Sequence, residues 1–279
     1  MSLDRLERLW RGFGVGLFLA VIGLGGSLLA LSVFPLIALA TRDPTRRQRR
    51  IQWVMHLSFR LYCAAIHVLR VADVEMRGAE RLRGLAGCLI VANHPSLLDV
   101  VMIMAMVPRV QCIVKGALWR HPFFRLTVGG AGYIRNDLEP EALMRACAET
   151  LAAGNNLIVF PEGTRTVPGA RPQFQRGFAN IATLAGADLQ LIFVTCRPPI
   201  LHKGNPWWRV PPRRTVFALE VGERLDIGRF LRYRSRPLAA RKLVEFLENL
   251  YSEKLGHGSV GSGAEAADHF SAEAGRSVA

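Results

Sequence analysis

Cysteine patterns that bind metals or form disulfide frameworks are absent from this sequence. The five cysteines, at positions 63, 88, 112, 147 and 196, form an odd and scattered set without a Cys-x-x-Cys pair. We therefore expect reduced cysteines in the core and no metal site. A Gly-x-Ser-x-Gly elbow is also missing, which argues against a serine hydrolase of the α/β type.

Charged residues are missing from Gly12 to Ala40, where Leu, Val, Ile, Phe and Ala dominate. A helix needs about 20 apolar residues to cross a bilayer, whereas the apolar core of a signal peptide has roughly 7 to 15. The run is therefore too long for a signal peptide and is typical of a membrane segment. A wholly buried helix of a soluble protein is the alternative.

The flanks of this apolar run bear on topology. Five arginines follow it within residues 42–50, whereas three arginines precede it together with Asp4 and Glu7. The positive-inside rule then favours a cytoplasmic (inner) membrane protein whose main domain faces the cytoplasm. Three glycines and Ser27 lie near the middle of the run, so a re-entrant hairpin is an alternative to a single tilted span. We assign residues 1–50 to this membrane anchor and its basic flank.

Strand-like and helix-like segments alternate through the rest of the chain. This alternation predicts one α/β domain over residues 51–255, with a mixed, mostly parallel sheet flanked by helices and an N-terminal apolar membrane helix or hairpin. Residues 51–70 have the pattern of an amphipathic helix that lies on the membrane or on the core. Residues 256–279, rich in Gly, Ser and Ala, predict a disordered tail. The predicted strands are 88–92, 110–114, 156–160, 189–195 and 215–222, and the predicted helices are 97–107, 140–152, 178–185 and 237–254.

His94 and Asp99 follow the first strand-like run, in the sequence Asn-His-Pro-Ser-Leu-Leu-Asp. Pro95 and Ser96 open a helix there, so the two residues lie at a strand-to-helix corner. On a regular helix a spacing of five puts them on different faces, so they meet only if the backbone turns between them. A carboxylate bonded to one imidazole nitrogen leaves the other to accept a hydroxyl proton. Ser96, as a hydrolase nucleophile, is the rival interpretation.

A second polar block, Pro-Glu-Gly-Thr-Arg, ends the strand-like run at 156–160. Arg165 offers a planar fork that suits phosphate oxygens, and Gly163 lets the backbone approach a ligand closely. Glu162 either pairs with Arg165 or hydrogen-bonds a substrate. A simple turn closed by a surface salt bridge is the alternative.

With these two blocks the chain resembles the glycerolipid acyltransferases, the family of the 1-acylglycerol-3-phosphate and related lysophospholipid acyltransferases. The family signature is a His-x4-Asp block followed some tens of residues later by Phe-Pro-Glu-Gly-Thr-Arg, which here are residues 94–99 and 160–165. Between them the family has a glycine-rich segment ending in an Arg that contacts substrate, and residues 129–135 are similar to it. Further similar segments extend the resemblance over roughly residues 85 to 200.

The resemblance implies transfer of a fatty acyl group from a thioester of coenzyme A or acyl carrier protein to the free hydroxyl of a lysophospholipid such as 1-acylglycerol-3-phosphate. It implies no other cofactor. His94 would be the general base and Asp99 would orient it, while free N–H groups from Ser96 to Leu98 would stabilise the oxyanion. The implied substrate-binding residues are Arg135, Glu162, Gly163, Thr164 and Arg165.

Departures from the family pattern leave the acceptor open. Pro95 and the pair Leu97-Leu98 stand where many members have a polar residue and an aromatic, and Thr166 stands where Ser is frequent. A lyso-ornithine lipid or a specialised lipid with an aryl polyene tail is the alternative acceptor. A membrane-tethered binding protein that has lost the chemistry is the alternative class.

The net charge of +14 suits an anionic membrane face and the phosphates of coenzyme A. It would attract nucleic acid equally well, but the sequence has no recognisable nucleic-acid-binding motif and its apolar run does not fit that class. We therefore expect membrane lipids and the acyl donor as partners, and no nucleic acid. Oligomeric state is not indicated by the sequence.

Overall fold

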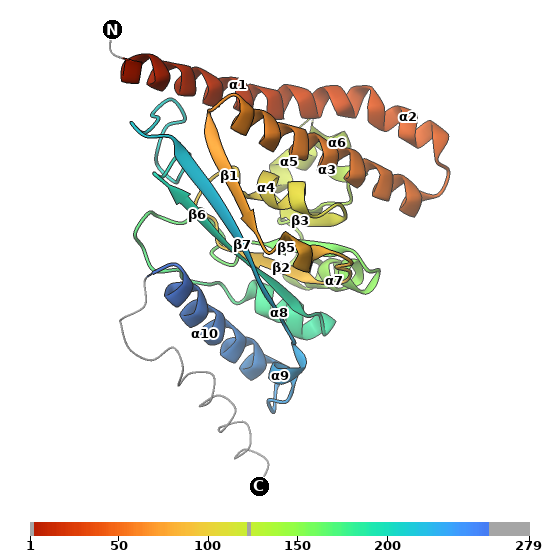
Figure 1. The fold of residues 1–279 in the computed structure, drawn as a ribbon. Helices are drawn as coiled ribbons and strands as arrows, with labels where there is room; N and C mark the ends of the chain where they lie inside the picture. Colours follow the sequence, from red (N-terminus) through yellow and green to blue (C-terminus); the bar gives the residue numbers. More distant parts are fainter. Residues whose placement is uncertain (1–2, 122–123, 257–279) are drawn as a thin grey trace.

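Seven strands form one sheet across the protein (Figure 1). The computed structural model describes residues 3–121 and 124–256. The strand order is β1-β7-β6-β2-β5-β3-β4, and among these strands β6 and β7 pair antiparallel while the other neighbours pair parallel. The predicted mixed, mostly parallel sheet is therefore confirmed. The strands are β1 (Ala72–Arg77), β2 (Leu89–Ala92), β3 (Val110–Val114), β4 (Ile134–Arg135), β5 (Asn156–Val159), β6 (Leu189–Arg197) and β7 (Thr215–Leu225).

Helices cover both faces of the sheet. Ile90 and Ala92 of β2 belong to the apolar core on one face, whereas Leu89 and Val91 belong to the core on the other. Because successive strand residues point to opposite faces, a strand covered on both sides needs a continuous apolar run. One face is covered by α1 (Leu3–Leu31), α2 (Val33–Ala40), α3 (Pro44–Val68), α4 (Asp99–Met106), α5 (Gly116–Arg120) and α6 (Phe124–Gly130). The other is covered by α7 (Pro140–Ala152), α8 (Gly177–Ala185), α9 (Gly228–Leu231) and α10 (Arg236–Lys254).

The predicted strands and helices of the domain are all present, with ends that differ by at most three residues, except that the helix predicted over residues 51–70 already begins at Pro44. The sequence did not predict β1, an outer strand that pairs with β7. Its charged residues Asp73, Glu75 and Arg77 replace the apolar run of the inner strands, because its outer half is exposed. A short 3-10 helix, η1 (Ala79–Leu82), follows it. The strand β4, with only two residues, is too short to leave a pattern.

The N-terminal apolar run forms α1 and α2, and the chain then reverses into α3 (Figure 1). The hairpin bend considered within residues 23–27 is absent, because α1 is helical throughout this stretch and Ser27 Oγ donates to the Gly23 carbonyl at 2.8 Å. The reversal lies instead between α2 and α3, where the Asp43 side chain accepts a hydrogen bond from the Thr45 N–H and caps α3. By length and composition, residues Arg5–Ala40 suffice to cross a membrane.

The helix α1 packs against the domain along much of its length. The indole N–H of Trp10 donates to the Leu69 carbonyl at 2.8 Å, and the Thr127 hydroxyl lies 3.4 Å from the Gly26 carbonyl. From Trp10 to Gly26 these contacts extend over about 24 Å of helix. The expected boundary between residues 50 and 51 falls inside α3, so the expected anchor and the sheet share one packed core. From residue 257 onward, the expected disordered tail lies outside the described residues.

Candidate active site

The polar blocks that follow β2 and β5 meet at one edge of the sheet. The two strands are parallel neighbours, so both blocks leave from the same edge. Asn93 ties the first block to β6, because its side-chain amide donates to the Val194 carbonyl at 2.7 Å and accepts from the Val194 N–H at 2.8 Å. His94 therefore starts from a fixed backbone position.

His94 and Asp99 form a hydrogen-bonded pair, with 3.0 Å between Nδ1 of the histidine and Oδ2 of the carboxylate. Asp99 is the first residue of α4 and is fully buried, and its Oδ2 also accepts from the Ser96 N–H at 2.7 Å. Since Nδ1 donates to the carboxylate, Nε2 of neutral His94 is left as an acceptor. The His94 side chain is 18% exposed, so a substrate hydroxyl can reach the ring.

The helix after His94 begins at Asp99 and not at Leu97, where the sequence placed its start. The intervening residues form a turn, in which the Leu98 N–H lies 3.4 Å from Ser96 Oγ. Because the Ser96 N–H is bonded to Asp99, this donor is not free for the expected oxyanion site. Ser96 is itself fully buried, which argues against its role as a nucleophile.

Burial raises the pKa of Asp99 to about 6, against the opposing effect of the hydrogen bonds from His94 and Ser96. The second carboxylate oxygen, Oδ1, is buried without a hydrogen-bond partner among the described residues. Near pH 7 the carboxylate is charged and poorly solvated, so an imidazolium forming beside it is favoured. The pair is thus arranged to stabilise His94 after it accepts a proton.

The second block holds the backbone of His94 on both sides. Glu162 Oε1 accepts from the His94 N–H at 3.0 Å and from the Thr166 hydroxyl at 2.7 Å, while the Thr166 N–H donates to the His94 carbonyl at 2.7 Å. Burial raises the pKa of Glu162, although both hydrogen bonds oppose the shift. The Phe160 ring stacks on His94, with 4.1 Å between centroids. The sequence did not reveal this clamp, because it joins residues 68 positions apart.

Arg165 points to the loop that follows β6. Its Nη1 donates to the Leu201 carbonyl at 2.7 Å and lies 3.4 Å from the His202 carbonyl. No ion pair joins it to Glu162 among the described residues, so the pairing considered from the sequence is not formed. Gly163 has a φ of +67°, a left-handed conformation that favours glycine, and Thr164 beside it is exposed.

Arg135 does not lie beside the His94–Asp99 pair. It is on β4, which β5 and β3 separate from β2, a distance of roughly 14 Å at usual strand spacing. Its side chain is bidentate to Asp137, with Nε and Nη2 at 2.9 and 3.1 Å from the two carboxylate oxygens. Asp137 also accepts from Arg120 at 3.0 Å. The hydrogen bond from Arg135 lowers the pKa of Asp137 to about 2, so this arginine is already neutralised by a partner that the sequence did not reveal.

Among the residues that the structure describes, no group of three His, Cys, Asp or Glu side chains is placed to hold a metal ion. The five cysteines are free and buried. Burial raises the pKa of Cys63, Cys112, Cys147 and Cys196 to about 12, so these thiols stay protonated at neutral pH.

The family model described as Acyltransferase matches residues 73–197. A 1-acyl-sn-glycerol-3-phosphate acyltransferase of Helicobacter pylori is 39% identical over 100 residues, which are 34% of this chain and 42% of that protein. An enzyme of the same name from Cocos nucifera is 34% identical over 99 residues, 33% of this chain and 32% of that protein. The aligned region thus spans less than half the length of either relative.

The crystal structure of the 1-acyl-sn-glycerophosphate (LPA) acyltransferase PlsC from Thermotoga maritima has the same fold. It superposes with a TM-score of 0.66 over 90% of this chain and 97% of that one, at 21% sequence identity. Fold and site together define a protein with an acyltransferase domain. For residues 73–197 these comparisons support the glycerolipid acyltransferase family, in agreement with the two sequence blocks that meet at His94.

Proposed function

We propose that this protein transfers a fatty acyl group from an acyl thioester to the free hydroxyl of a lysophospholipid such as 1-acylglycerol-3-phosphate. The observation that carries the proposal is the His94–Asp99 pair, which leaves Nε2 of an accessible imidazole as a proton acceptor. The names of the curated relatives support the same class of reaction. The donor is a thioester of coenzyme A or acyl carrier protein, and no resident cofactor is needed.

The proposed reaction is a direct transfer. Nε2 of His94 takes the proton of the acceptor hydroxyl as its oxygen attacks the thioester carbonyl, so the new ester C–O bond forms and the C–S bond breaks. The thiolate leaves and receives the proton from the imidazolium. Asp99 stabilises that imidazolium and keeps the proton of the neutral ring on Nδ1. Glu162, Thr166 and Phe160 hold His94 in position for both proton transfers.

Recognition of the acceptor phosphate is assigned to Arg165, with Gly163 and Thr164 in the same exposed turn. The guanidinium of Arg165 bonds through one nitrogen to backbone carbonyls, which leaves donors on its other nitrogens for a ligand. Arg135 is less suited to bind the acceptor phosphate, because Asp137 already binds its guanidinium in bidentate fashion. A lyso-ornithine or aryl-polyene-type acceptor would not need this phosphate contact.

The protein is proposed to act at the cytoplasmic face of the inner membrane, docked by the outer face of its N-terminal helices. Apolar side chains are exposed along α1 every three or four residues, as in a helix that lies in the membrane interface. Because α1 packs on the domain from Trp10 to Gly26, surface docking fits these contacts better than a span that leaves the domain. The exposed residues of α1 are Leu6, Leu9, Phe13, Leu17, Val21, Leu24, Leu28 and Leu31, and those of α3 include Trp53, Leu57 and Leu61.

One experiment tests the proposed function and ranks its acceptors. Purified protein is incubated with acyl-coenzyme A or acyl carrier protein thioester against a panel of lyso-lipids, with thiol release and lipid product measured together. We expect product with 1-acylglycerol-3-phosphate and equal amounts of thiol released. Product with a lyso-ornithine lipid alone would replace the acceptor, and thiol release without a lipid product would indicate hydrolysis and refute the proposal.

A further inference from the structure

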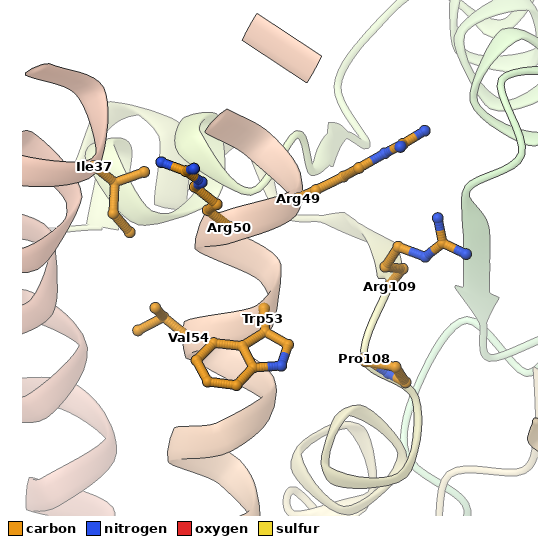
Figure 2. Close-up of a pocket in the computed structure, with 7 residues that line it drawn as sticks. All are labelled: Ile37, Arg49, Arg50, Trp53, Val54, Pro108 and Arg109. Atoms are coloured by element: carbon orange, nitrogen blue, oxygen red, sulfur yellow. The ribbon is translucent and has the colours of Figure 1, made fainter. Parts of the chain in front are cut away.

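A groove of about 540 Å³ lies between the N-terminal helices and the loop that joins α4 to β3 (Figure 2). Its size is within the range of roughly 300–1,000 Å³ that is usual for small-molecule sites. The groove lies at the end of α4 opposite to Asp99, and β3 starts beside it, so it is at the sheet edge opposite to His94. It is therefore separate from the catalytic pair. The apolar lining is Ile37, Trp53, Val54 and Pro108, and the charged lining is Arg49, Arg50 and Arg109.

The charge in this groove is of one sign. Figure 2 shows the guanidinium groups of Arg49 and Arg109 on the same side of the groove, whereas that of Arg50 points the other way, toward Ile37. Arg50 is fixed by a hydrogen bond of 2.7 Å from its Nη1 to the buried hydroxyl of Thr41. The side chains of Arg49 and Arg109 make no hydrogen bond or ion pair with any residue of the described ranges, and no Asp or Glu lines the groove.

The positions of these side chains are set by the fold. Trp53 follows Arg49 by four residues and Arg50 by three, and Val54 follows Arg50 by four, so these side chains share one broad face of α3. The backbone of Arg109 is anchored, because its carbonyl accepts a hydrogen bond of 3.0 Å from the buried Asn156 side chain. The unpartnered guanidinium groups thus stand above an apolar floor on a firm backbone.

We infer that this groove binds one anionic phospholipid of the membrane, with its phosphate at Arg49 and Arg109 and an acyl chain along Trp53, Val54 and Ile37. A guanidinium fork matches phosphate oxygens, and the apolar floor matches a hydrocarbon chain. Trp53 is 56% exposed and continues into the apolar face of α3, so a lipid in the groove is continuous with the docked bilayer. The inference rests on the membrane docking proposed above. The bound lipid does not react, because it lies at the opposite sheet edge from His94.

The test compares retention of two lipids by the full chain. Native mass spectrometry of the protein in non-ionic detergent is run with added phosphatidylglycerol or with phosphatidylcholine of the same acyl chains. The variant Arg49→Gln with Arg109→Gln is compared with Arg232→Gln with Arg241→Gln, which removes the same charge from exposed positions near α9 and α10. We expect the protein to bind one phosphatidylglycerol at a saturable site. The affinity for this lipid should fall by about tenfold or more only in the groove variant, because charge-assisted hydrogen bonds are lost.

Several outcomes would overturn the inference. Equal losses of phosphatidylglycerol affinity in both double variants would mean nonspecific charge attraction. Displacement of phosphatidylglycerol by inorganic phosphate at a concentration equal to that of the lipid would mean that phosphate alone is recognised. Binding of acyl carrier protein that is lost in the groove variant, with lipid retention unchanged, would assign the groove to the donor. A raised KM of the groove variant for a soluble short-chain lyso-lipid would make it part of the acceptor site.

A separate experiment tests the proposed membrane docking independently of the groove. Flotation of the wild-type protein with phosphatidylcholine vesicles tests the apolar face of α1 and α3 without anionic lipid. Absence of flotation together with retention of phosphatidylglycerol would refute the docking and keep the groove site.

Discussion

Replacing Asp99 by Asn removes one charge from the proposed catalytic pair with little change of shape. In wild type the same oxygen, Oδ2, accepts from His94 Nδ1 and from the Ser96 N–H. The amide oxygen of Asn can occupy this place and keep both hydrogen bonds. The variant therefore isolates what the carboxylate charge contributes to stabilising the imidazolium that forms during acyl transfer.

The magnitude follows from the short distance between the two groups. Two unit charges about 4 Å apart interact by about 4 kcal/mol at an effective dielectric constant of about 20. Losing that interaction only after His94 is protonated predicts a fall in kcat of about 10³-fold, with KM for the acceptor little changed. Steady-state thiol release measures both constants, and Asp226→Asn on the exposed surface serves as the matched control. A variant with kcat within about threefold of wild type would refute the role of Asp99.

The same Asp99→Asn variant lowers kcat but removes a pH-dependent loss of folding stability. Because the folded pKa of Asp99 is about 6 against an ordinary value of 3.8, the folded protein keeps a proton that the unfolded chain releases between these values. Wild-type stability therefore falls as pH rises through this window, by about 3 kcal/mol in total. Asn lacks this loss, although its buried NH₂ group replaces an unpartnered oxygen and costs about 1–3 kcal/mol at any pH. Urea unfolding at pH 4.5 and 7.5 should show the variant gaining relative to wild type at the higher pH.

Three further substitutions test binding, positioning and docking. Arg165→Ala should raise KM for 1-acylglycerol-3-phosphate more than Arg135→Ala does, with Arg165→Lys partly restoring it; equal KM values would place the phosphate elsewhere. Thr166→Val should lower kcat by about 3- to 30-fold at unchanged KM, because Glu162 loses a hydrogen bond. Thr166→Ser keeps the hydroxyl and should restore kcat. A wild-type kcat in the Val variant would contradict the role of Glu162 and Thr166 in holding His94. Leu24→Glu with Leu28→Glu, both exposed, should abolish flotation with neutral vesicles while soluble-substrate activity remains, and unchanged flotation would contradict the docking face.

The sequence was sufficient for the inner sheet because both of its faces are covered. Strands such as Leu89–Ala92 are continuous apolar runs, and the helix Pro140–Ala152 has a clear apolar face, so their bounds agree with the prediction to within one residue. The sequence did not predict the edge strand β1, because its alternating charged residues are typical of a loop. The path of α1 was not predicted either. Composition predicts an apolar helix, but tertiary contacts such as those of Trp10 and Gly26 are needed to reveal that it lies along the domain.

The His94–Asp99 pair was predictable because both residues lie within one short block, whereas the residues that support it come from elsewhere in the chain. The turn between His94 and Asp99 follows from local sequence, and the structure has the hydrogen bond that this turn allows. The hydrogen bonds to Glu162 and the neutralisation of Arg135 by Asp137 depend on tertiary placement or on rotamers. No local pattern encodes these contacts, so residue type and spacing alone could not reveal them.

The most direct test of the central claim is the turnover of His94→Ala. Thiol release and lipid product are measured with acyl-coenzyme A and 1-acylglycerol-3-phosphate, on protein whose folding is verified by thermal unfolding. The account predicts that kcat falls by about 10²–10⁴-fold while KM is retained, and that added imidazole restores part of the activity by occupying the space against Phe160. Wild-type turnover by the folded variant would contradict the assignment of His94 as the base.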